Sequence, residues 1–203
     1  ISVSAFYKKF LNPIESKAVV GTSGSTFSFA NAFQSDVAGV EIEFKKSFTT
    51  AKNYFIQHLG LMANASYIYS KVNLGKENVG QSDNRPLQGQ SPYSINAGIF
   101  FEDKELGLQA NLLYNVIGKR IAFVGTDDNP DIYEMSRHIL DFNIQYRFKK
   151  NVELSLSAND LINQPILFLQ DGNRDKKWNR NSDQVFQKYQ PGQTISLGVK
   201  YNF

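Results

Sequence analysis

The sequence predicts an all-β protein, an antiparallel transmembrane β-barrel segment of about eight strands. Three observations lead to this prediction: apolar and polar residues alternate over long stretches, short and long connections alternate between these stretches, and aromatic residues gather at their ends. Because successive side chains of a strand point to opposite faces of the sheet, the alternation gives one apolar and one polar face. A tilted strand crosses a bilayer with about 9–11 residues, which is the length of these stretches.

The alternation is clearest in residues 194–203. The apolar face of this stretch carries Ile195, Leu197, Val199, Tyr201 and Phe203, and its polar face carries Thr194, Ser196, Gly198, Lys200 and Asn202. Leu113 interrupts the pattern in another stretch, and the pattern is weakest around residues 1–11. The same reasoning predicts the remaining strands over residues 1–11, 38–45, 59–70, 93–102, 106–115, 140–148 and 152–159.

The connections between these strands alternate in length. Short connections at residues 49–54, 102–105 and 149–151 are typical of tight hairpins. The other connections are long and cover about residues 12–36, 73–90, 119–137 and 163–192. Outer-membrane barrels have short periplasmic turns and long extracellular loops. If the last strand ends in the periplasm, every short turn lies there and every long loop is extracellular, so the sequence predicts a location in the outer membrane.

The aromatic residues support the same orientation. The chain contains 16 Phe and 10 Tyr residues, and many of them lie where a predicted strand ends. Amphipathic rings collect at membrane–water interfaces, so a barrel carries an aromatic girdle at each interface. The predicted periplasmic girdle includes Phe48, Phe101, Phe148 and Phe203, and the predicted extracellular girdle includes Tyr67, Tyr69, Tyr93 and Tyr114.

The composition excludes several classes of protein. The chain has a net charge of +3, which is too small and too evenly spread to indicate nucleic-acid binding. It contains no cysteine, so it has no disulfide framework and no thiol chemistry. No run of about 18 apolar residues is present, so the sequence predicts no transmembrane helix.

Several motifs resemble the barrel of a known family. Five motifs are similar to motifs in the C-terminal barrel region of TonB-dependent outer-membrane receptors of Bacteroidetes type, and they follow one another in the same order. They are residues 12–15 (NPIE), 39–43 (GVEIE), 85–93 (RPLQGQSPY), 130–134 (PDIYE) and 159–163 (NDLIN). Each motif alone is weak, but the ordered set covers nearly the whole chain.

The resemblance implies an energy-coupled nutrient transporter whose complete barrel has about 22 strands around a plugged lumen. Residues 1–203 would form the C-terminal part of that barrel, without the plug domain and the TonB-contacting segment. The implied partners are outer-membrane lipid, the missing plug and barrel strands, the TonB complex through the missing segment, and a surface lipoprotein as a further candidate. The resemblance implies no nucleic-acid partner.

The polar faces of the predicted strands agree with a wide lumen. They carry small polar groups, which are better suited to lining water or a hydrophilic plug than to filling a closed eight-stranded barrel. These residues are Asn64, Ser66, Asn96, Asn111, Asn143, Ser155, Ser157 and Ser196. A complete small barrel with a structural role, a role in adhesion or a narrow pore is the alternative, because charged residues such as Arg147 and Glu153 also suit a packed polar interior.

No catalytic, metal or cofactor site is predicted, and the sequence does not indicate an enzyme. The only histidines, His58 and His138, have no further nitrogen or sulfur ligand to complete a zinc site. Residues 171–175 (DGNRD) begin like a calcium loop, but Lys176 stands where the sharp turn needs Gly. Residues 21–26 have the glycines of an anion-binding loop without its Lys, so a flexible extracellular loop is predicted there.

The long connection at residues 163–192 is the predicted place for ligand contact. It carries Trp178, the only Trp of the chain, together with Arg174, Arg180 and Tyr189. Aromatic and charged side chains on a long loop suit a polar or amphipathic substrate. For residues 85–93 we expect a structural role, a turn set by Pro86 and Pro92 that leads the chain back into the membrane. The sequence does not identify the substrate.

Overall fold

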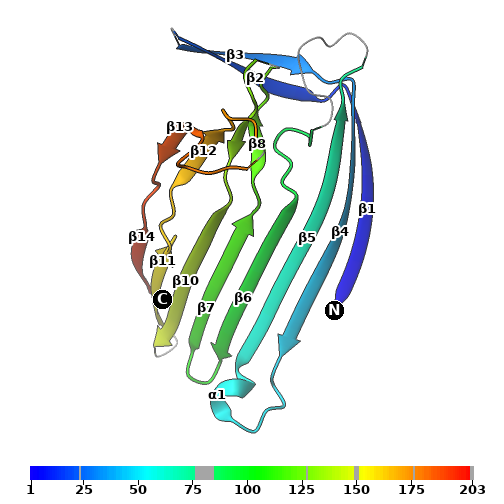
Figure 1. Ribbon diagram of the computed structural model, residues 1–203. Helices are drawn as coiled ribbons and strands as arrows, with labels where there is room; N and C mark the ends of the chain where they lie inside the picture. Colours follow the sequence, from blue (N-terminus) through cyan, green and yellow to red (C-terminus); the bar gives the residue numbers. More distant parts are fainter. Residues whose placement is uncertain (23, 76–84, 127, 149–150, 176, 202–203) are drawn as a thin grey trace.

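The wall of the molecule is one antiparallel sheet of eight strands (Figure 1). The computed structural model describes residues 1–22, 24–75, 85–126, 128–148, 151–175 and 177–201. The order of strands across the sheet is β1-β4-β5-β6-β7-β10-β11-β14, so each neighbour in the sheet is the next wall strand along the chain. The strands are β1 (Ser2–Leu11), β4 (Gln34–Ser47), β5 (Leu59–Asn73), β6 (Tyr93–Asp103), β7 (Leu108–Ile117), β10 (Arg137–Phe148), β11 (Val152–Asn159) and β14 (Thr194–Tyr201). All eight predicted strands are confirmed.

The register of the wall places like residues side by side. Asn111 pairs with Asn143, Asn143 with Ser157, and Ser157 with Ser196, which forms a polar row across four strands. One residue further along the strands, the row on the other face consists of Leu112, Phe142, Ala158 and Ile195. The apolar row is exposed at its β14 end, since Ile195 is 70% and Leu197 is 83% accessible. The two faces therefore differ in chemistry as the alternation predicts.

The wall is open at both sides. Within the described residues, β1 pairs only with β4, and β14 pairs only with β11. A complete barrel has no edge because its first and last strands pair with each other. The chain therefore forms a partial barrel, and the alternative of a closed eight-stranded barrel is not the observed fold. Phe203, one of the predicted periplasmic aromatics, lies outside the described residues.

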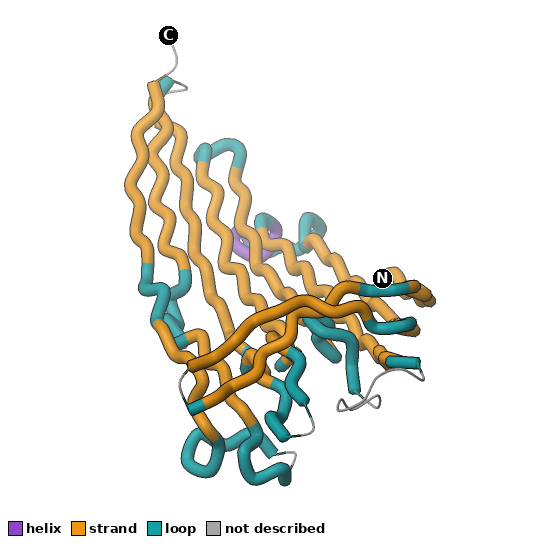
Figure 2. Tube along the Cα trace, turned by 90° about the horizontal axis from the view of Figure 1, so that it is seen from above, coloured by secondary structure: helices purple, strands orange, loops and turns teal. Residues whose placement is uncertain are grey.

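In the described part of the chain, the first, third and fourth long connections contain strands of their own. The first forms the hairpin of β2 (Ile14–Gly21) and β3 (Gly24–Asn31), so the expectation of a flexible loop at residues 21–26 is wrong for its described part. The third and fourth form a small sheet in the order β13-β12-β9-β8, with β8 (Arg120–Phe123), β9 (Ile132–Glu134), β12 (Ile166–Gln170) and β13 (Gln184–Tyr189). Strand pairing satisfies the backbone polar groups that a long loop would leave open. Figure 2 shows the hairpin running across one end of the wall.

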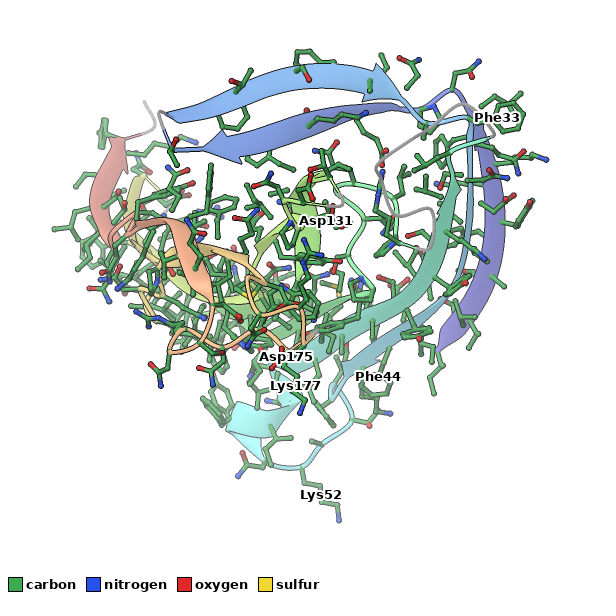
Figure 3. The ribbon with its side chains drawn as sticks, turned by 45° about the horizontal axis from the view of Figure 1, so that its top comes forward. Phe33, Phe44, Lys52, Asp131, Asp175 and Lys177 are labelled. Atoms are coloured by element: carbon green, nitrogen blue, oxygen red, sulfur yellow. The ribbon has the colours of Figure 1, made fainter. Side chains whose placement is uncertain are left out.

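The opposite end of the wall carries the short turns. One of them is more than a tight hairpin, because it contains the single-turn helix α1 (Tyr54–Gln57). The Asn53 side chain caps this helix by accepting hydrogen bonds from the backbone N–H groups of Phe55 and Ile56 at 2.9 and 3.1 Å. Lys52 lies at the tip of the turn and points away from the sheet (Figure 3).

Most of the buried apolar residues lie in the extracellular layer, and the others, such as Val72 and Val116, lie near the ends of wall strands. Ile121, Ile132 and Leu169, from β8, β9 and β12, are at most 1% exposed. Ala32, Val72 and Leu74 form a second cluster, against which Leu87 packs. The wall itself leaves its apolar side chains exposed, as expected of a surface that contacts lipid. No helix among the described residues is long and apolar enough to span a membrane.

Candidate ligand-binding site

The hairpin β2–β3 and the four-stranded sheet join into one extracellular layer. The Ala18 N–H donates to the Val124 carbonyl, and the Val124 N–H donates to the Ser16 carbonyl, each at 2.9 Å. Phe27 of β3 packs against Phe123 at 5.1 Å between ring centroids and against Phe186 of β13 at 6.4 Å. Residues from the first, third and fourth long connections thus form a common structure above the wall.

A buried ion pair fixes the second long connection to this layer. The Arg85 guanidinium donates two hydrogen bonds to the Glu15 carboxylate, at 2.7 Å and 2.6 Å. The side chains of Arg85 and Glu15 are only 4% and 2% exposed. Gln88 adds a further link, because its Oε1 accepts the Ser16 N–H at 2.5 Å and its Nε2 donates to the Ala122 carbonyl. The motif at residues 85–93 therefore does more than form a turn, since it binds hairpin and sheet together.

Ionisable groups lie beneath the hairpin, close to this pair. Asp131 lies between hairpin β2–β3 and the wall strands (Figure 3), and its Oδ1 accepts the Gly125 N–H at 2.8 Å. Burial raises the pKa of Asp131, and the hydrogen bond from the Gly125 N–H and the nearby charge of Arg85 partly offset this effect. Burial, together with the charge of Asp131, raises the pKa of Tyr133 to about 12. Asp131 and Tyr133 thus lie in a buried part of the layer that favours their neutral, protonated forms.

Trp178, the first of the predicted ligand contacts, packs against two residues of this layer. Its ring lies 4.6 Å from the Tyr133 ring, and the Lys119 Nζ lies 3.1 Å from its ring centroid. The pKa of Lys119 is lowered by burial, which Asp171 partly offsets. The buried Trp178 indole N–H has no hydrogen-bond partner within the described residues. The aromatic and cationic contacts hold residue 178 on the small sheet.

The other predicted contacts have different neighbours from Trp178. The Arg174 guanidinium donates to the Asp128 carbonyl at 3.1 Å, and Arg180 is exposed. Tyr189 is at the end of β13, opposite Ile166, and lines a hollow on the sheet face. Contacts to Lys119 and Tyr133 were not predicted, because they join segments of the chain that no local pattern relates.

The polar face of the wall carries a ladder of asparagine side chains. Asn96 donates to the Asn64 Oδ1 at 2.7 Å, and Asn115 donates to the Asn96 Oδ1 at 2.5 Å. The ladder crosses β5, β6 and β7, and the amides satisfy one another within the sheet. This hydrogen-bonded polar surface suits the lumen of a wide barrel.

The observed architecture matches a known family and known structures. A family model described as "TonB dependent receptor-like, beta-barrel" matches residues 1–161. The chain belongs to this family. Its location is therefore the outer membrane, and the family and its structural neighbours are receptors and transporters, not enzymes. A search among curated proteins finds no match.

Solved structures of this barrel type resemble the chain throughout its length. The copper transporter OprC is 18% identical with a TM-score of 0.59, and the match covers 99% of this chain and 28% of OprC. The ferric yersiniabactin uptake receptor FyuA from Yersinia pestis is 16% identical with a TM-score of 0.59, and the match covers 99% and 34%. The outer membrane transporter YddB from Escherichia coli is 13% identical with a TM-score of 0.59, and the match covers 99% and 30%. The chain thus spans about a third or less of the length of these neighbours.

Proposed function

We propose that the chain is the C-terminal part of the barrel of a TonB-dependent outer-membrane transporter, of the type found in Bacteroidetes, that takes up a nutrient with energy supplied through TonB. The observation that carries this proposal is the open wall, apolar on one face and polar on the other, with a built extracellular layer at one end. A wall of this kind encloses a lumen only together with further strands.

The proposal assigns a task to each part of the chain. The apolar face contacts outer-membrane lipid, and the strands satisfy their backbone polar groups within the sheet, as lipid requires. The edges at β1 and β14 pair with the remaining strands of the barrel, and the asparagine ladder faces a plug domain that lies outside residues 1–203. TonB engages the transporter through a segment in that other part of the protein. A surface lipoprotein that covers the extracellular layer is a further proposed partner.

The ligand contacts are proposed to lie in the extracellular layer. Of the predicted contacts, Tyr189 lines a hollow, and the Trp178 ring is held on the layer by Tyr133 and Lys119. Arg174 and Arg180 are exposed on the same long connection and are proposed to attract a polar ligand. Loops held on a rigid barrel are suited to this role because they present several side chains to the outside at once.

Two measurements test this function. The purified chain of 203 residues in detergent is expected to show no heat-modifiable migration, whereas the full-length receptor shows it, because a closed barrel needs the remaining strands. Receptor-dependent nutrient uptake by cells is expected to stop when TonB is deleted. A heat-modifiable monomer formed by the chain alone, or uptake that continues without TonB, contradicts the proposal.

A further inference from the structure

The hollow of the extracellular layer that Tyr189 lines has the chemistry of a ligand site. We propose that this hollow, on the face of the sheet β13-β12-β9-β8, binds a neutral, hydroxyl-rich ligand, an oligosaccharide. It has a volume of about 570 Å³, within the range of small-molecule sites. The inference rests on the proposed uptake function and specifies its substrate class.

The floor of the hollow is one cross-strand row. Arg120 pairs with Glu134, Glu134 with Phe168, and Phe168 with Gln187, so these four side chains follow one another across the whole sheet on one face. Adjacent side chains in such a row are about 5 Å apart. The row therefore presents a charged pair, an aromatic ring and an amide in sequence, over a length that suits an extended ligand.

The walls of the hollow come from two other connections. Ser16 of hairpin β2–β3 lines one side together with Gln88 and Gly89. The Gly89 N–H donates to the Ile121 carbonyl at 2.9 Å, and both ends of the Gln88 amide are bonded to backbone groups. The wall is thus held in place by hydrogen bonds, and the hollow is preformed.

The charges of the hollow cancel. The Arg120 Nε donates to the Glu134 Oε2 at 2.9 Å, and the Arg120 Nη2 lies 2.8 Å from the same carboxylate oxygen in an ion pair. Among the described residues that line the hollow, Arg120 and Glu134 are the only charged ones. An anionic ligand such as a ferric chelate therefore meets no uncompensated cation here. The charge balance favours a neutral ligand.

The bonding pattern of the pair leaves groups for hydroxyls. Because both contacts of the pair end on the Glu134 Oε2, the Glu134 Oε1 remains as an acceptor and the Arg120 Nη1 as a donor, and neither forms a hydrogen bond with another described residue. A vicinal diol of a sugar ring offers one donor and one acceptor, which can bond to such a pair of groups. The Gln187 amide and the Tyr189 hydroxyl form no hydrogen bond within the described residues, and both line the hollow. These groups supply further polar contacts.

Aromatic rings supply the apolar contact that a sugar ring requires. Phe168 lies in the floor between the charged pair and Gln187, and Phe123 and Tyr189 also line the hollow. An extended peptide would instead seek the backbone groups of a free sheet edge, whereas the floor of this hollow is a sheet face made of side chains. The observations therefore favour an oligosaccharide over a peptide.

The test is a binding experiment on the full-length receptor in detergent. Isothermal titration with maltoheptaose, cellohexaose and xylohexaose is expected to show binding of at least one of these neutral oligosaccharides. Gln187→Ala and Phe168→Ala are expected to weaken that binding about tenfold each. Gln184→Ala is the matched control, because Gln184 is an exposed glutamine of the same strand outside the hollow, and it is expected to leave the affinity unchanged.

Other outcomes overturn the inference. If none of the three sugars binds at millimolar concentration, or if a neutral peptide or an anionic ferric chelate binds instead with the same dependence on Gln187, the assignment of the hollow is wrong. Binding that persists in both variants also contradicts it. TonB-dependent uptake is measured separately in cells, so failure of the hollow assignment leaves the uptake function standing, and loss of the uptake function leaves the binding result interpretable.

Discussion

Glu15 and Arg85, 70 residues apart in the chain, meet in a buried two-point ion pair with bonds of 2.7 and 2.6 Å. Glu15 belongs to the hairpin above the wall, and Arg85 precedes the strand β6 of the wall. The pair therefore ties an extracellular hairpin to the barrel. Its burial means that each partner depends on the other for compensation of its charge.

Glu15→Ala is expected to loosen the extracellular layer by about 3–5 kcal/mol, because Arg85 is left buried without a counter-charge. Limited proteolysis of the receptor on whole cells measures the effect as cleavage within the hairpin region. The double variant with Glu15→Leu and Arg85→Leu is expected to resist the protease better than Glu15→Ala. Equal protection of Glu15→Ala and the natural protein would show that the pair does not hold the layer.

Gly39 lies beneath the ring of Phe6 on the neighbouring strand. A Cβ at residue 39 would come within 2.5 Å of the Phe6 Cζ and 3.0 Å of the Tyr67 carbonyl oxygen. Gly39→Ala is therefore expected to destabilise the wall by about 1–3 kcal/mol, the usual range for overpacking. Thermal loss of the heat-modifiable form measures this.

Gly60 is the matched control for Gly39, since the nearest atom to a Cβ there is 3.7 Å away. Gly60→Ala is expected to be tolerated. Adding Phe6→Ala to Gly39→Ala is expected to recover part of the lost stability. An equal loss in Gly39→Ala and Gly60→Ala would attribute the effect to backbone flexibility and not to the ring.

Leu197 and Ser196 are neighbours on β14 that point to opposite faces. Leu197→Arg is expected to cost about 2–4 kcal/mol if the side chain lies near the bilayer midplane. Ser196→Arg introduces the same group on the polar face and is expected to cost far less. The fraction of heat-modifiable receptor in the outer membrane compares the two variants. A larger loss in Ser196→Arg than in Leu197→Arg would contradict the assignment of the apolar face to lipid.

Asp131 makes the extracellular layer sensitive to pH. Burial raises the pKa of Asp131 above the ordinary value of 3.8. The contribution of Asp131 to the free energy of unfolding is therefore fully present below pH 3.8 and is lost as the pH rises through the raised pKa. At neutral pH the layer therefore carries the cost of a buried carboxylate. Asp131→Asn keeps an acceptor for the Gly125 N–H and removes the charge, so it is expected to raise the unfolding temperature at pH 7.

The advantage of Asp131→Asn is expected to vanish in acid, where the natural carboxyl is also neutral. Scanning calorimetry of the receptor in detergent at neutral and acid pH compares the variant with the natural protein. Asp128→Asn is the control, because Asp128 is exposed near the same turn. A stabilisation of Asp131→Asn that is the same at both pH values would exclude the ionisation of residue 131 as its cause.

The strands of the membrane wall could be predicted because the pattern that identifies each strand lies within a short stretch of the sequence. Alternation at every second residue identifies a strand and both of its faces without reference to any other part of the chain. Its ends were less well predicted: β4 runs from Gln34 to Ser47, beyond the predicted residues 38–45, and β7 begins at Leu108. The ends of a strand depend on pairing with its neighbours, as where Gln34 of β4 pairs with Leu11 and Asn73, and the alternation within one strand does not reveal this pairing.

The sequence by itself determined the strands of the wall, their lipid-facing residues and their orientation, since each follows from a repeat of period two and from connection lengths. Only the tertiary structure decided how the long connections are used. The pairing of Glu15 with Arg85, the packing of Trp178 on Tyr133 and the row from Arg120 to Gln187 join segments far apart in the chain. Such contacts depend on the path of the backbone in space, because no periodicity relates residues that meet only after the wall has formed.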